Sequence, residues 1–193
     1  MLLLLLGGMD SYAAGRWYQV ELIVFKQSGA TTEHFYQTAH RIVWPGRLVE
    51  LSGYASLQTL QARPVSYTKI KSSDWTMHWP ERQLKRAGGY TPLLHVSWLQ
   101  QVGRNRLSNA VHVYRTDGHG DYPVNGPVRI QRGNYLHLLV DLEYTGDVVD
   151  GEAFRTVVYR LKEKRRIKLN EIHYLDHPRF GVIAKVKLVA VGR

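Results

Sequence analysis

The chain has 193 residues, 44% of them hydrophobic and 11% aromatic, and its formal net charge is +10 at pH 7. These totals exclude a disordered chain and predict one domain, or two small ones, with a real core. The absence of cysteine excludes disulfide frameworks, thiol catalysis, Cys-ligated zinc and a lipoprotein's lipidated cysteine. The charge indicates an anionic partner such as nucleic acid, acidic lipid or a carboxylate-bearing polymer, although a solvated strand face explains it equally well.

The first residues resemble the end of an export signal. A leucine run over residues 2–6 is followed by two glycines, and Ala13 and Ala14 provide a small-residue cleavage site. The basic region that normally precedes such a run is missing, so the signal looks truncated; an apolar first strand is the alternative interpretation. We expect residues 1–14 to be a signal peptide and residues 15–193 to form one domain. No other apolar run approaches the ~20 residues of a membrane-spanning helix.

Residues 17–25 form the first predicted strand, because apolar and polar side chains alternate there with the period of a β-strand. The next fifty residues are predicted to be rich in loops. Within them we expect a short helix beginning at 31–33, a turn at 44–46 and a short strand at 65–70.

The middle of the chain predicts one helix and then a hairpin. A proline in the first turn and two glycines after the last turn predict a helix over residues 80–87. Residues 90–101 alternate as a strand, and residues 110–115 are expected to be its hairpin partner. Residues 116–127 are polar and rich in Gly and Pro, which predicts a loop.

The second half of the chain predicts a series of antiparallel strands. Residues 128–144 form a long predicted strand with a break at Arg132 and Gly133, residues 145–151 a turn, and residues 154–161 the returning strand. The fold class we expect is α+β: a single domain built on a largely antiparallel β-sheet with one or two short helices.

The last predicted hairpin, residues 165–189, is the most chemically crowded part of the chain. Asp176, His177 and Pro178 lie where the chain reverses, because the proline fixes its own φ and keeps the preceding residue out of the helical region. Residues 180–188 then alternate, with one apolar face. A hairpin with an ordinary buried side and a polar turn suggests a binding edge.

Rings and cations gather on this hairpin and on the long strand before it. Residues 155–187 contain ten Lys or Arg against three acidic residues. Aromatic rings stack on sugar faces and guanidinium groups clamp carboxylates, so such a surface suits a glycan that carries acidic peptides. Single-stranded nucleic acid is the alternative, which the export signal disfavours. The residues that carry this argument are Tyr135, His137, Arg165, Arg166 and His173.

No motif of the chain requires catalysis. Ser66 and Lys69 match S-x-x-K, but this stretch is predicted to be extended and the partner motifs of penicillin-binding enzymes are absent. His173, Asp176 and His177 suggest a metal, but the following proline argues against one helix face, and hydrogen bonds that fix the turn are the preferred interpretation. We therefore expect no catalytic residue, no metal and no cofactor.

Four stretches of the chain resemble the CsiV family of peptidoglycan-binding periplasmic proteins. The resemblance implies an exported, non-enzymatic protein that binds peptidoglycan in the periplasm. It also implies support of wall synthesis by a class A penicillin-binding protein together with that enzyme's outer-membrane lipoprotein activator. The stretches are YQVELIVF (18–25), YTPLLHVSWLQ (90–100), NYLHLLVDLEY (134–144) and RRIKLNEIHYLDHPRFGVIAKV (165–186).

The resemblance adds motif positions to the candidate site. Beside the residues already named it implies Glu171, Tyr174, Asp176 and His177 as candidate ligand-binding positions, and it marks Leu136, Pro178, Phe180 and Gly181 as matching positions. A purely structural network of Arg165, Glu171 and Asp176 is the competing interpretation. For function, the alternatives are a protein–protein adaptor of the wall-synthesis machinery with no glycan site of its own and, less favoured, a cytoplasmic nucleic-acid-binding domain.

Overall fold

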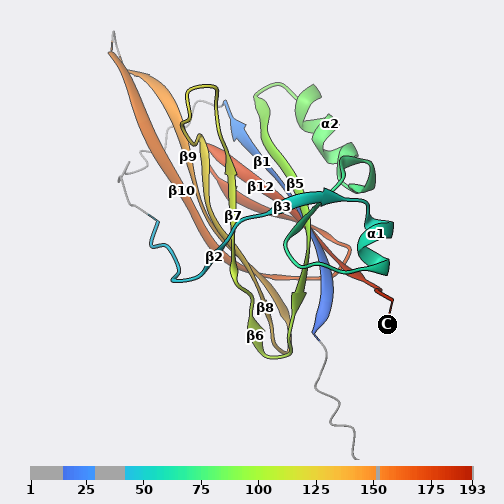
Figure 1. Cartoon of the computed structure of the whole chain (residues 1–193). Coiled ribbons are helices and arrows are strands. Elements are labelled where there is room, and N and C mark those ends of the chain that lie inside the picture. The colour runs from blue at the N-terminus through green and yellow to red at the C-terminus, as the bar shows by residue number, and fades with distance from the viewer. Residues whose placement is uncertain (1–14, 29–41, 151–152, 193) are drawn as a thin grey trace, which may run out of the picture.

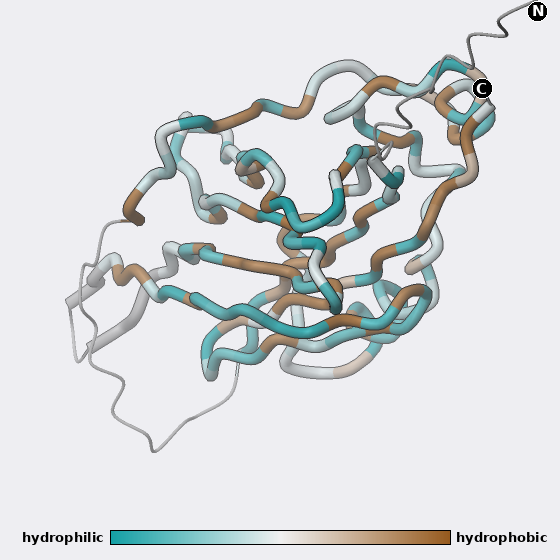
Figure 2. The backbone as a smooth tube through the Cα atoms, turned by 90° about the horizontal axis from the view of Figure 1, so that it is seen from below, coloured by the Kyte–Doolittle hydropathy of each residue, from teal (hydrophilic) through white to brown (hydrophobic). Residues whose placement is uncertain are grey.

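Two β-sheets packed face to face organise the chain in the computed structural model, which describes residues 15–28, 42–150 and 153–192 (Figure 1). Hydrophobic and hydrophilic residues follow one another in short stretches along the strands (Figure 2). This alternation is expected of strands that are buried on one face and exposed on the other. The α+β class and the largely antiparallel pairing predicted from the sequence are confirmed, but the strands divide into two sheets.

The first sheet, called sheet A, has β1 near its centre. β1 pairs antiparallel with β12 on one side and with β5 on the other, so the N-terminal and C-terminal strands are neighbours. Among the described strands of this sheet, only β3 and β4 pair in parallel. In spatial order the strands are β11 (Ile172–His177), β12 (Phe180–Val189), β1 (Arg16–Gln27), β5 (Tyr90–Val102), β4 (Thr68–Ile70) and β3 (Ser52–Ala55).

The second sheet, called sheet B, is a meander of four long antiparallel strands with two short additions. β2 adds to β7 in parallel, and β6 pairs with β8. The chain passes from β2 in sheet B directly to β3 in sheet A, so this segment ties the two sheets together at one edge. In order the strands are β10 (Ala153–Ile167), β9 (Leu136–Asp150), β8 (Val124–Arg132), β7 (Ala110–Arg115) and β2 (Leu48–Val49), with β6 (Arg106–Leu107) beside β8.

Both α-helices lie on the side of sheet A, whereas β9 and β10 form the opposite side of the molecule (Figure 1). The helix predicted at 80–87 is confirmed as α2 (His78–Arg86). The other helix, α1 (Leu57–Ala62), is capped at its N-terminus by Ser56, whose hydroxyl accepts a hydrogen bond from the Thr59 backbone N–H. A 3₁₀ turn, η1 (Ser72–Asp74), precedes α2. Neither α-helix among the described residues is long and apolar enough to cross a membrane.

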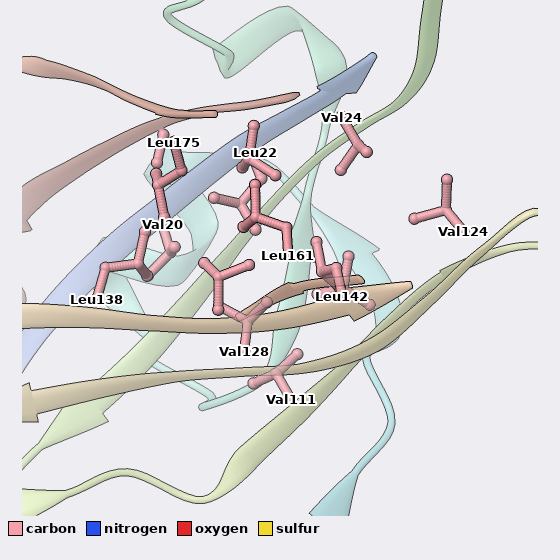
Figure 3. Close-up of a cluster of buried hydrophobic side chains, with 14 of the residues drawn as sticks. Val20, Leu22, Val24, Val111, Val124, Val128, Leu138, Leu142, Leu161 and Leu175 are labelled. Carbon is pink, nitrogen blue, oxygen red and sulfur yellow. The ribbon is translucent and has the colours of Figure 1, made fainter. Parts of the chain in front are cut away.

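The main core fills the space between the two sheets. Inward side chains from both sheets interdigitate there, as expected for face-to-face packing. Trp98 and Phe180 are among the largest fully buried side chains. A smaller cluster around Leu60 lies beneath α1. Figure 3 labels part of the main core: Val20, Leu22, Val24, Val111, Val124, Val128, Leu138, Leu142, Leu161 and Leu175.

Several sequence-based predictions are confirmed at the level of single elements. The strands predicted at 17–25 and 90–101 are β1 and β5, and the strand predicted at 154–161 is part of β10. The chain reversal at Pro178 joins β11 to β12, with His177 opposite Phe180. The helix predicted to begin at 31–33 lies outside the described residues.

Other predictions are wrong in how strands pair. Residues 110–115 are not the hairpin partner of 90–101, because β7 pairs with β8 and β2 in the other sheet. The long strand predicted at 128–144 is indeed broken after Arg132, into β8 and β9, but β8 already begins at Val124 inside the predicted loop. The turn predicted at 145–151 is also wrong, because β9 continues to Asp150 against β10.

The predicted hairpin at 165–189 is correct only in its second half. Arg165 and Arg166 belong to the end of β10 in sheet B, where they pair with Leu138 and His137 of β9. A turn through Asn170, whose φ is +65°, then carries the chain to β11 in sheet A. Asn tolerates this left-handed conformation better than most residues.

Candidate functional site

The sequence-predicted residues lie along one edge of the sandwich, where β10 of sheet B and β11 of sheet A are the outermost strands. We call this the hairpin edge. Arg166 and His137 are cross-strand partners on the outer face of sheet B. The Arg166 guanidinium carbon lies 3.4 Å from the centroid of the Tyr135 ring, which is 52% exposed. The structure therefore brings these three residues together as a cation–π pair beside an imidazole.

Arg165 points to the other face of β10, because neighbouring residues of a strand project in opposite directions. Its Nε donates to Glu163 Oε1 at 2.6 Å, and 43% of its side chain is exposed. The two arginines that are adjacent in sequence thus do not form one patch. Neither lies in the core.

A hydrogen-bonded network on β11 joins the hairpin edge to β1. The Tyr174 hydroxyl donates to Asp176 Oδ1 at 2.6 Å, and Gln27 Nε2 donates to the same oxygen at 3.0 Å. Gln27 Nε2 also lies 3.2 Å from the His177 carbonyl oxygen. Burial, together with the bond to Asp176, raises the pKa of Tyr174 well above its ordinary value. These contacts fix the hairpin to its neighbouring strand.

The other predicted residues of β11 and its preceding turn also contact the protein itself. The Lys168 backbone N–H donates to His173 Nε2 at 3.0 Å, and Glu171 forms an exposed ion pair with the Lys168 side chain. The His177 ring packs 5.2 Å from the Phe180 ring, and burial lowers the pKa of His177. The predicted residues therefore form two groups: Tyr135, His137 and Arg166 on sheet B, and an internally bonded set on β11.

A large cleft opens at the other side of the sandwich, where both sheets narrow. In sheet A, β4 pairs only with Trp98 and Leu99 of β5, so residues 94–97 have no partner strand beyond them in the described chain. In sheet B, β2 pairs only with Ala110 and Val111 of β7. The space left between these edges has a volume of about 710 Å³. We call it the edge cleft; it is lined by residues of 51–54, 69–75, 94–97 and 112–116.

Aromatic and cationic side chains dominate the chemistry of the edge cleft. Tyr54, Trp75 and Tyr114 supply rings, while Leu94 and Val96 supply apolar surface. Tyr54 is 66% exposed, so its ring is available to a ligand.

The charge of the cleft comes from Lys69, Lys71 and Arg115, and no Asp or Glu stands among the lining residues. The Lys69 ammonium lies 5.2 Å from the Tyr54 ring centroid. Neither lysine forms an ion pair with any residue that the structure describes. Arg115 Nη1 donates to the Leu93 carbonyl oxygen at 2.7 Å and so links the two sheets. The side chains that line the cleft therefore carry a net positive charge.

A buried carboxylate supports the wall of the edge cleft. The Glu21 side chain is 1% exposed and accepts hydrogen bonds from the backbone N–H groups of Thr76 and Met77. His95 Nε2 lies 2.9 Å from Glu21 Oε1, and His95 Nδ1 lies 2.9 Å from Glu81 Oε2. Burial alone would raise the pKa of Glu21, but the hydrogen bonds from His95, Thr76 and Met77 outweigh it and hold the pKa below its ordinary value.

This network reaches the cleft surface through ring contacts. The His95 ring lies 4.0 Å from the Trp75 ring, and Trp75 Nε1 donates to the Ile70 carbonyl oxygen at 2.9 Å. Trp75 is thus held from two sides. The ring that a ligand would meet is positioned before the ligand arrives.

Sequence reasoning missed the edge cleft entirely. Its residues come from four separated segments, and two of these lie in the region predicted to be loops. A partial signal existed in YTPLLHVSWLQ. His95 lies there on the same strand face as Leu93 and Ser97, and it is the only imidazole in an otherwise apolar or small set. The pairing of Lys69 with Tyr54 had no sequence signal, because it depends on the parallel β3–β4 contact.

Comparison with known proteins gives one match. A family model described as "Peptidoglycan-binding protein, CsiV" matches residues 1–189 of the 193-residue chain. No curated protein and no solved structure shows a significant match to this chain.

Proposed function

Because this chain belongs to the CsiV family of peptidoglycan-binding proteins, we propose that it holds peptidoglycan in the edge cleft. One observation carries the proposal: the cleft combines three aromatic rings with three cations and has no acidic residue in its lining. Peptidoglycan offers the complementary chemistry, since its sugars present flat faces and its peptides present carboxylates. The proposed role is binding without catalysis.

Each part of the cleft has a distinct task in this proposal. Tyr54 and Tyr114 stack against sugar rings, and Trp75 forms a fixed third surface. Lys69 and Lys71 attract the peptide carboxylates as point charges, whereas Arg115 is partly engaged by a backbone carbonyl. The size of the cleft fits the range of ligand pockets, which is about 300–1,000 Å³.

The residues predicted from the sequence remain a separate proposal for the same ligand. Tyr135 stacked on Arg166 offers a ring and a cation on sheet B, with His137 beside them. On β11 the side chains of Tyr174 and Asp176 bind one another first, so a ligand would have to compete with existing hydrogen bonds. For this reason the edge cleft is the favoured site.

The test is sedimentation with purified sacculi across a salt series. We expect Lys69→Gln with Lys71→Gln to lower the affinity about tenfold and to weaken its salt dependence, because two screened attractions are lost. Arg82→Gln with Arg86→Gln on the exposed surface of α2 is the matched control, because it removes the same charge from residues that do not line the cleft.

The decisive comparison is with Arg165→Ala and Arg166→Ala at the hairpin edge. If these two substitutions abolish sacculus binding while Lys69→Gln with Lys71→Gln binds like the native chain, the cleft is not the site. Melting temperatures of all variants separate a loss of affinity from a loss of fold.

We further propose that the protein acts in the periplasm, supporting wall synthesis by a class A penicillin-binding protein and its outer-membrane lipoprotein activator. What supports this is the family resemblance and the basic, ring-lined cleft; a nucleic-acid partner is not proposed. The second candidate, an adaptor without a glycan site, predicts that both protein partners are captured in pull-downs that contain no sacculi. Cleft variants would then leave that capture unchanged.

A further inference from the structure

The outer face of sheet B carries a charged surface that the edge cleft does not use. Outward residues of β10 recur every second position, and Lys162 and Lys164 stand next to each other on this face. Arg129 of β8 lies in the same cross-strand row as Lys164, with Leu139 between them. Neither lysine has an ion-pair partner in the described part of the chain. Both described α-helices lie on the side of sheet A, and none of the described helices lies on this face (Figure 1).

An exposed apolar segment lies against this charged face. Val43 is 80% exposed and Trp44 is 42% exposed. Val43 and Pro45 line a groove of about 420 Å³ together with Leu139, Lys162 and Lys164. The groove also holds Asp141 and Glu163, but these carboxylates are paired with Arg160 and Arg165, whereas the two lysines are not. The Trp44 ring contacts His112 of sheet B edge-on, with the ring centroids 5.2 Å apart, so the segment is held on the sheet. Cations and unburied apolar groups therefore share one surface.

We propose that this face, formed by Val43, Trp44, Arg129, Lys162 and Lys164, docks on the surface of an anionic phospholipid membrane. Its cations attract the lipid headgroups, and Val43 and Trp44 enter the interface between headgroups and acyl chains. The exposed apolar residues favour a membrane over other anionic partners. A wall polymer or a nucleic-acid backbone gives an exposed valine no apolar phase to enter, whereas a bilayer does. The docking is peripheral, and its cations are not those of the edge cleft.

The experiment is flotation of the full chain with vesicles of phosphatidylglycerol and phosphatidylcholine, compared with phosphatidylcholine alone. We expect binding only to the anionic vesicles. Lys162→Gln with Lys164→Gln should lower the affinity roughly 30-fold, because each surface cation near such a membrane contributes about 1 kcal/mol. The α2 pair Arg82→Gln and Arg86→Gln removes the same charge from the opposite face and should change it less than twofold.

Two further variants separate insertion from charge. Val43→Ser keeps every cation and should lower vesicle affinity about fivefold, because an apolar side chain no longer leaves water. Tryptophan emission of the native chain should shift to the blue on anionic vesicles, and Trp44→Phe should remove most of that shift. Charge attraction without insertion would leave Val43→Ser unchanged, which overturns the proposal.

Other outcomes also overturn it. Equal binding to both vesicle types would mean that the face does not recognise anionic lipid. The same follows if the Lys162→Gln, Lys164→Gln variant (the sheet B pair) and the α2 pair lose equal vesicle affinity. Inhibition by millimolar glycerophosphate would show a site for the free headgroup instead of a membrane surface. If the sheet B pair loses sacculus or oligonucleotide binding as strongly as vesicle binding, the face is a general polyanion surface. Lys69→Gln with Lys71→Gln should keep vesicle binding, so this proposal and that of the cleft fail separately.

Discussion

The two edges of the sandwich hold similar residue types in opposite states. At the hairpin edge the polar side chains of β11 are bonded to one another and to Gln27 of β1. At the edge cleft, Lys69 and Lys71 have no ion-pair partner in the described chain, and Tyr54 is mostly exposed. The dense polar motif of the sequence is therefore satisfied by internal hydrogen bonds, whereas the cations of the edge cleft come from separated segments and have no ion-pair partner in the described chain.

The largest expected effect on stability concerns the buried Glu21 carboxylate that supports the wall of the edge cleft. Glu21→Gln should lower the free energy of unfolding by about 2–4 kcal/mol at pH 7, because a buried, multiply hydrogen-bonded carboxylate is lost. Urea unfolding followed by tryptophan fluorescence measures this. Glu171→Gln, which removes only an exposed ion pair, is the control and should cost less than about 0.5 kcal/mol.

The same variant predicts a pH dependence. The pKa of Glu21 lies below its ordinary value of 4.5 in the folded protein, so its contribution to stability is complete above the unfolded pKa. That contribution disappears as the pH falls through the lowered folded pKa. The gap in stability between the native chain and Glu21→Gln should therefore close below about pH 4.5. Parallel curves down to pH 3 would contradict the assigned role of the carboxylate.

The next effect tests whether the hairpin edge is structural. A Cβ at Gly181 would lie 2.6 Å from Phe25 Cζ and 2.9 Å from Tyr174 Cε2, because both rings lie over this glycine. Gly181→Ala should cost about 1–3 kcal/mol through overpacking and leave sacculus affinity unchanged. Gly88→Ala has open space around it and is the control. A loss of affinity with an unchanged melting temperature would place the ligand at this edge instead.

A smaller effect compares the rings of the two sites directly. Tyr54→Leu with Tyr114→Leu should weaken sacculus binding about tenfold, at roughly 0.5–1.5 kcal/mol per ring. Tyr135→Leu removes a ring of similar exposure from sheet B and should leave the affinity within twofold. The reverse order of the two losses, measured in one co-sedimentation series, would favour the sequence-predicted residues.

The smallest expected effect concerns one hydroxyl. Tyr174→Phe removes the donor to Asp176 and should cost about 1 kcal/mol of stability. Tyr90→Phe is the matched control, since its ring packs on Phe25 and no hydrogen bond of its hydroxyl occurs among the described residues. Equal melting temperatures for the two variants would show that the Tyr174–Asp176 bond adds nothing.

The sequence predicted local structure well, because alternation and turn chemistry act over a few residues. The break near Arg132 and the reversal at Pro178 were located correctly. Pairing was predicted less well, since a period of two gives the buried face of a strand but not its neighbour. Residues 110–115 follow β5 closely in sequence, yet they join the other sheet. The threonine and glycine at 145–146 suggested a turn, but pairing with β10 carries the strand through them.

The candidate sites differ in how far sequence could reveal them. Arg166 and Tyr135 were both predicted as site residues, and the structure stacks one on the other. The edge cleft depends on where two sheets end, which is a property of the assembled sandwich and of no single stretch. Only His95, a polar residue between the apolar neighbours Leu94 and Val96 of β5, was a local sign of it.

The pairing of β1 with β12 has a consequence for how the chain acquires its fold. Trp17 lies opposite Val189 in this ladder, so a strand from the beginning of the chain completes its hydrogen bonds only with one from the end. While the chain is being synthesised, the backbone groups of β1 that face β12 therefore stay unpaired until the last residues are available. Such distant contacts make assembly slow, and they leave an aggregation-prone strand exposed whenever translation stops early.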